Sequence, residues 1–170
     1  LLGQAPADAK VDYVIEAPES YKAGDEITVT VTVKNITAEN GLHVVNFTLL
    51  YDNEKLVLTN DIDEDEDNRL VCILDENLPD KWENWTKVNN NADEVEDGEV
   101  SPINDGTILA SALTDKDNAK YAITEDGALV FTFTFTANED ATGDTWVAIP
   151  NESIVGALNT AAGADRYTGT

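Results

Sequence analysis

The sequence predicts an all-β sandwich, and three observations lead to that fold class. Apolar and polar residues alternate along several segments, most clearly 26–36 and 127–137, and this period of two is the pattern of a strand with one buried face. Turns rich in Gly, Pro, Asn and Asp separate the segments, and little of the chain has a helical pattern. We therefore expect a sandwich of about nine strands, with a short helical or irregular insertion around 76–100.

Three strands are predicted in the first third of the chain, at 11–17, 26–36 and 41–51. The second strand places Val and Ile on one face and Thr on the other. The third strand also has two distinct faces, which are Phe47, Leu49 and Tyr51 on one side and Asn46, Thr48 and Leu50 on the other. A sharp break then leads into a short fourth strand.

The middle of the chain is strongly acidic. Six of the seven residues in 61–67 are Asp or Glu, which predicts a solvated acidic loop. The short apolar stretch 70–74 is expected to be a buried strand, with Cys72 packed inside. A polar loop at 89–99 completes this block.

A short helix is predicted to begin near Asn77, because Asn caps helices and Pro79 is tolerated in a first turn. Trp82 and Trp85 would then share one face of that helix. Two interpretations follow for this pair. Either the two indoles stack on sugar rings, or they fix the inserted segment to the sandwich while Trp146 belongs to the core; the second interpretation is favoured.

The second half contains three clear strands and one weaker one. The segment 107–114 has a small, tightly packed face of Ile108, Ala110 and Ala112. In 127–137, Leu129 and three phenylalanines alternate with Val130 and threonines. Another strong strand is predicted at 146–150, and a weaker edge strand near 164–168.

Length and charge limit the function. The 170 residues fit one domain at 11–170, preceded by a linker or processed end at 1–10. A net charge of -24 repels phosphate backbones and anionic lipid, so nucleic acid and membrane surfaces are poor partners. No apolar run is long enough to insert into a membrane. With a single cysteine the chain forms no intrachain disulfide, which suits a bacterial extracellular protein.

The sequence contains no recognisable catalytic or metal motif, so an enzyme is not expected. Its one histidine, His43, is predicted to lie at the surface, and one His with one Cys cannot close a zinc site. The segment 61–67 begins like an EF-hand loop but has Glu66 where Gly is needed and Cys72 where Glu is needed. A looser surface calcium site in this segment stays open as an alternative to the solvated loop.

Several motifs together resemble those of the cohesin family. These are Gly24-Asp25 before a Val/Thr strand, Gly41-Leu42 leading to Phe47, Tyr51-Asp52 and Leu56, the strand Gly127–Phe135, and Gly143 before an apolar strand. The resemblance covers roughly 10–60 and 105–150 and favours a divergent ruminococcal type. It implies a nine-stranded jelly roll without cofactor, secreted or held at a bacterial cell surface.

The resemblance also implies a function: a non-catalytic module, monomeric when free, that docks a calcium-loaded dockerin and so anchors polysaccharide-degrading enzymes to an extracellular scaffold. The contact residues it implies lie on the outward face of one sheet, on three of its strands, and are Asn46, Thr48, Leu50, Leu109, Ser111, Leu113, Val130, Thr132 and Thr134. The alternative function is a carbohydrate-binding module of the same architecture that uses Trp82 and Trp85.

Overall fold

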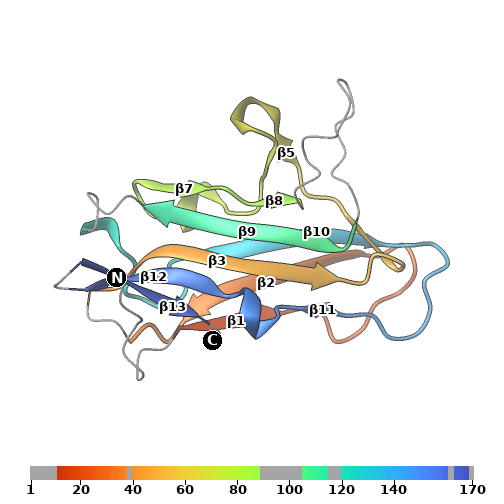
Figure 1. Cartoon of the computed structure of the whole chain (residues 1–170). Helices are drawn as coiled ribbons and strands as arrows, with labels where there is room; N and C mark the ends of the chain where they lie inside the picture. Colours follow the sequence, from red (N-terminus) through yellow and green to blue (C-terminus); the bar gives the residue numbers. More distant parts are fainter. Residues whose placement is uncertain (1–10, 38–39, 89–104, 115–119, 161–162, 169–170) are drawn as a thin grey trace.

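Antiparallel strands form two facing layers in this protein (Figure 1). The structure is a computed structural model, and it describes residues 11–37, 40–88, 105–114, 120–160 and 163–168. Those residues contain thirteen strands, of which nine have at least three residues and four have only two. The number of longer strands agrees with the prediction of about nine.

One layer is a four-stranded sheet, with the order β1-β2-β10-β4. Its members are β1 (Asp12–Glu16), β2 (Glu26–Lys34), β10 (Val130–Ala137) and β4 (Leu56–Leu58). The other layer is a seven-stranded sheet built around β3 and β9, with β12 and β13 on one side and β7 on the other. Its members are β3 (Leu42–Tyr51), β9 (Thr107–Thr114), β12 (Val155–Thr160), β13 (Gly163–Thr168), β7 (Trp82–Asn84), and the short β8 (Lys87–Val88) and β11 (Val147–Ala148).

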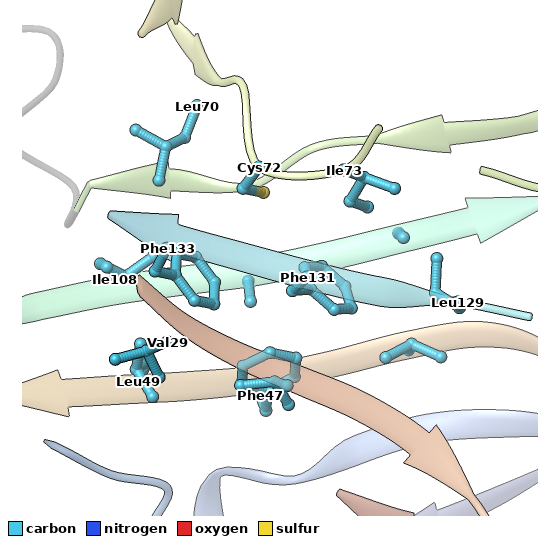
Figure 2. Packing of buried hydrophobic residues seen from close by; sticks show 14 of the residues in the cluster. Val29, Phe47, Leu49, Leu70, Cys72, Ile73, Ile108, Leu129, Phe131 and Phe133 are labelled. Carbon is cyan, nitrogen blue, oxygen red and sulfur yellow. The ribbon is translucent and has the colours of Figure 1, made fainter. Parts of the chain in front are cut away.

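The core lies between the two sheets and is built from the inward residues that the alternation predicts. The phenyl rings of β10 face the other layer, where Phe47 meets Phe131 edge-on with ring centroids 4.9 Å apart (Figure 2). Tyr51 and Phe135 lie at the same centroid distance, 4.9 Å. Ala110 and Ala112 on β9 are buried, and their small side chains leave room for these rings.

The acidic segment forms a hairpin that projects beyond the sandwich (Figure 1). It contains β5 (Ile62–Asp63) and β6 (Arg69–Leu70), joined by the 3-10 turn η1 (Glu64–Glu66). Leu70, Cys72 and Ile73 are buried, and all three belong to the core cluster (Figure 2). The prediction of a buried Cys72 is therefore confirmed, but the prediction that 70–74 is a buried strand is wrong, because β6 ends at Leu70 and both Val71 and Leu74 are exposed.

The predicted helix near Asn77 is wrong. A single 3-10 turn, η2 (Asp75–Asn77), is followed by β7 and β8, both of which pair with β9. Because side chains in a strand alternate, Trp82 and Trp85 point to opposite faces and do not share one. The predicted loop 89–99 lies outside the described residues.

The C-terminal part also differs from prediction. The expected strand near 164–168 is present as β13, but β12 was not predicted because its Gly, Ala and Asn residues have weak strand propensity. Trp146 is not a core residue, since 51% of it is exposed. The strong strand predicted at 146–150 is reduced to the two residues of β11, and the Trp146 indole lies near Pro18 and Tyr21.

Candidate functional site

Six of the predicted contact residues lie together on the outer face of the seven-stranded sheet. In the β3–β9 register, Asn46 is opposite Ser111 and Thr48 is opposite Leu109. Further along the two strands, Leu50 on β3 lies opposite Thr107, and Leu113 on β9 lies opposite Val44. We call these six residues the front face: Asn46, Thr48, Leu50, Leu109, Ser111 and Leu113. All six are partly exposed, whereas their neighbours along each strand are buried.

The front face continues onto β7 and β8, which the sequence did not predict as strands. Glu83 is opposite Leu113, and Lys87 is opposite Leu109. Between them, the Trp85 amide donates a 2.8 Å hydrogen bond to the Ser111 carbonyl. Since Asn84 and Thr86 point inward and are held there by hydrogen bonds, Trp85 points outward.

The Trp85 side chain is held by two polar neighbours. Its Nε1 donates to a Glu83 carboxylate oxygen at 2.9 Å. The Arg69 guanidinium lies over the indole, with its central carbon 3.3 Å from the ring centroid. Arg69 also forms a 3.6 Å ion pair with Glu66. These contacts fix the indole while 37% of Trp85 stays exposed.

The other three predicted contact residues do not belong to this surface. Val130, Thr132 and Thr134 lie on β10, which pairs with β2 and β4 in the four-stranded sheet. Their strand neighbours Phe131 and Phe133 point inward, toward the layer that contains Phe47, so Val130, Thr132 and Thr134 face away from it. The prediction that all nine residues share one face is wrong, because the choice of sheet depends on long-range pairing.

The structure does not form a paired tryptophan platform. Trp82 is only 5% exposed, and its Nε1 donates to the Tyr121 carbonyl at 2.8 Å. Only Trp85 of the pair reaches the surface. The carbohydrate-binding alternative needs both rings on one face, and the strand geometry excludes that arrangement for Trp82 and Trp85.

The titratable groups with shifted pKa values are buried. His43 is 6% exposed, so the prediction of a surface histidine is wrong, and burial lowers its pKa. The register of the β3–β12 pair shifts beside His43, between Ala157 and Leu158. Burial also raises the pKa of the Cys72 thiol and of Tyr51, each to about 12. Such a thiol stays protonated and unreactive at neutral pH.

Neither a metal cluster nor a membrane-spanning helix is found in the part of the chain that the structure describes. No three His, Cys, Asp or Glu residues there converge on a point that could hold a metal ion. Asp63, in the predicted acidic loop, accepts a hydrogen bond from the Asp65 amide at 3.1 Å and so shapes the local turn. Within the same residues, no helix is long and apolar enough to cross a membrane.

Comparison with known proteins supports one family. The cohesin domain profile matches residues 11–166. No curated protein sequence matches the chain. Among solved structures, a cohesin of OlpA in complex with Doc918 from Clostridium thermocellum is 16% identical, with a TM-score of 0.57, over 93% of this chain and 97% of that one.

Two further cohesins have the same fold. The seventh type I cohesin of ScaB from Pseudobacteroides cellulosolvens is 18% identical, with a TM-score of 0.60, over 93% of this chain and 84% of that one. A type II cohesin in the Coh3ScaB–XDoc complex from Acetivibrio cellulolyticus is 20% identical, with a TM-score of 0.51, over 94% of each chain. These likenesses confirm the jelly-roll sandwich. Because the profile spans nearly the whole chain, this protein belongs to the cohesin domain family.

Proposed function

We propose that this chain is a non-catalytic receptor module that binds a calcium-loaded dockerin through the front face. The proposal is supported by family membership and by the fold shared with cohesins that were solved together with dockerins. Through such a contact the module would attach a polysaccharide-degrading enzyme to a scaffold outside a bacterial cell.

One observation carries the proposal: six outward side chains of β3 and β9 form a continuous field in register. Leucines lie beside amide and hydroxyl groups, and this mixture of apolar anchors and hydrogen-bonding groups suits an interface between proteins that also exist apart. Leu109 and Leu113 are the central apolar anchors. Asn46 and Ser111, opposite each other, supply polar contacts between them.

The charge of the module suits a partner with basic residues. The net charge is -24, so its field attracts cationic surfaces and speeds their encounter. We expect no cofactor in the module itself. Calcium would belong to the dockerin, whose fold it maintains, and the affinity would depend on calcium for that reason.

Isothermal titration against a panel of recombinant dockerins, with calcium and again with EDTA, tests this function. The panel includes the dockerins present in the complexes of the structural relatives. We expect tight 1:1 binding to at least one dockerin, which EDTA abolishes. Binding to none of them by a module shown to be folded would overturn the proposal.

A further inference from the structure

The edge of the front face at β7 has a chemistry that differs from its centre. Trp85 lies beside Ser111, and Glu83 lies opposite Leu113, so both residues continue rows of the proposed interface. The centre offers leucines and small polar groups, whereas the edge offers an indole and a carboxylate. The exposed indole is also fixed in place by the Glu83 hydrogen bond and the Arg69 stack.

We propose that Trp85, Arg69 and Glu83 form a subsite that accepts a Lys or Arg side chain of the partner; this inference rests on the proposed dockerin-binding function. The aliphatic stem of such a side chain packs on the exposed part of the indole. Its charged head meets the Glu83 carboxylate, which retains acceptor capacity after receiving the Trp85 Nε1–H. Trp85 and Glu83 contact the partner, and Arg69 is a positioning residue that holds the indole.

The charges around the subsite favour a cation over an anion. The neighbouring segment 61–70 has six acidic residues and Arg69 as its one base. The ion pair with Glu66 offsets the charge of Arg69. The other base on this face, Lys87, is outnumbered by the acidic residues of 61–67. An incoming Lys or Arg would therefore meet a net negative surface together with an aromatic ring, a combination that supports cation–π contact.

The subsite is built by a part of the chain that carries none of the cohesin-like sequence motifs, although the cohesin domain profile spans it. Arg69 comes from the β5–β6 hairpin, and the Leu70 amide ties that hairpin to the Thr86 carbonyl at 2.7 Å. The inserted hairpin is thus hydrogen-bonded to the edge of the proposed interface, and its Arg69 stacks on Trp85 there. The hairpin would help to select among dockerins, because the subsite adds contacts only for a partner that places a basic residue against Trp85 and Glu83.

The test measures the affinity of Trp85 and Glu83 variants for a dockerin from the panel that binds the unaltered module. Trp85→Ala is expected to weaken binding at least about 30-fold, as buried aromatic anchors do. Trp146→Ala is the matched control, since it removes another exposed indole, which lies beside Pro18 and Tyr21 and outside the proposed subsite, and it should leave the affinity unchanged. Where Trp85→Ala lowers the folding yield, Trp85→Phe serves instead, with an expected loss of about threefold to tenfold.

Glu83→Gln separates the charge from the hydrogen bond. Its amide oxygen still accepts from Trp85 Nε1, so the indole stays in place while the charge is removed. We expect a slower association rate and a weaker dependence of that rate on salt. Arg69→Lys keeps the charge but loses the planar stack, so the affinity should fall while the salt dependence stays as it is.

The outcomes distinguish this inference from the function on which it rests. If the Trp85→Ala and Trp146→Ala variants bind a dockerin equally well, the subsite is overturned and the proposal of dockerin binding stays intact. Unchanged salt dependence in Glu83→Gln would overturn the assignment of a cationic partner group. Failure of the unaltered module to bind any dockerin would overturn both proposals.

Discussion

The Asn60 side chain bridges two backbone segments at the edge of β10. Its Nδ2 donates to the carbonyls of Val71 and Thr132, at 2.8 and 2.9 Å. Its Oδ1 accepts from the Thr134 amide at 2.8 Å. The side chain therefore ties the inserted segment to the four-stranded sheet by satisfying backbone groups on both.

Asn60→Ala should lower the free energy of unfolding by about 2–3 kcal/mol, because three backbone groups lose their partner at once. Asn138→Ala is the matched control. It removes one 2.8 Å bond, to the Glu54 carbonyl, and should cost only about 1 kcal/mol. Urea unfolding followed by tryptophan fluorescence measures both values, and equal losses would contradict the bridging role.

His43 makes stability depend on pH on the acid side. Burial lowers its pKa in the folded protein, so the unfolded chain binds a proton more readily. The stability that the neutral ring contributes is complete above the unfolded pKa of about 6.5 and is lost as the pH falls through the folded pKa.

Replacing this residue tests the linkage. The difference in unfolding free energy between pH 7.5 and pH 5.5 should be smaller in His43→Leu than in the unaltered protein, since Leu cannot take up a proton. Chemical denaturation at both pH values measures that difference. An identical difference in the two proteins would show that His43 does not titrate in this window.

At the scale of elements, the connection from β2 to β3 depends on a glycine. Gly41 has a φ of +82°, and a Cβ there would lie 2.8 Å from the Ile123 carbonyl carbon. That position is fixed because Leu42 and Ile123 exchange backbone hydrogen bonds of 2.9 and 3.0 Å. Neither backbone can withdraw without breaking this bridge.

Gly41→Ala should therefore destabilise the protein by more than about 3 kcal/mol, through the left-handed backbone and the steric overlap together. Gly127→Ala separates the two effects. Gly127 has a φ of +76° with no atom within 4 Å of the Cβ position, so its loss should be about 1–2 kcal/mol. Similar melting temperatures for the two variants would contradict the account.

The strands that could be predicted from the sequence are those whose two faces meet different surroundings. β2, β3, β9 and β10 each have eight or more residues, so their alternation is visible, and their inward sets were predicted correctly. β7 and β8 have three and two residues, too few to show a period of two, and Asn77 with Pro79 resembles a helix start. Tertiary pairing with β9 overrides that local preference.

The candidate site, too, could be predicted only where alternation within one strand decides the position of a residue. The outward residues of β3 and β9 were predicted because the period fixes the side to which each one points. Which sheet β10 joins depends on contacts distant in sequence, so Val130, Thr132 and Thr134 were assigned to the wrong surface. Trp85 was missed as part of the front face because its direction depends on whether the segment is a helix or a strand.

At the scale of the whole molecule, charge dominates the behaviour in solution. The chain has 34 acidic and 10 basic residues, and their mutual repulsion opposes the compact state. Added salt screens exposed charges beyond about 10 Å at 0.1 M. The melting temperature should therefore rise between 20 mM and 300 mM NaCl in calorimetry, and a fall over that range would contradict this view of the charge.

The two sheets also divide the molecule into two outer surfaces with different expected roles. The front face carries Leu109 and Leu113 within a field of amide and hydroxyl groups. The outer face of the four-stranded sheet carries Val130 among threonines, and the Thr134 hydroxyl there lies 3.1 Å from that of Thr59. Val130 and Leu113 are both outward and partly exposed, so they form a matched pair for comparing the two surfaces.

The most direct test of the account compares Leu113→Asp with Val130→Asp in titrations against a calcium-loaded dockerin that binds the unaltered module. Both variants place a charge on an outward strand position, so circular dichroism and melting temperature control for folding. We expect Leu113→Asp to weaken binding at least about 30-fold and Val130→Asp to leave it unchanged. The opposite result, with binding lost only in Val130→Asp, would place the dockerin on the other sheet and contradict the assignment of the front face.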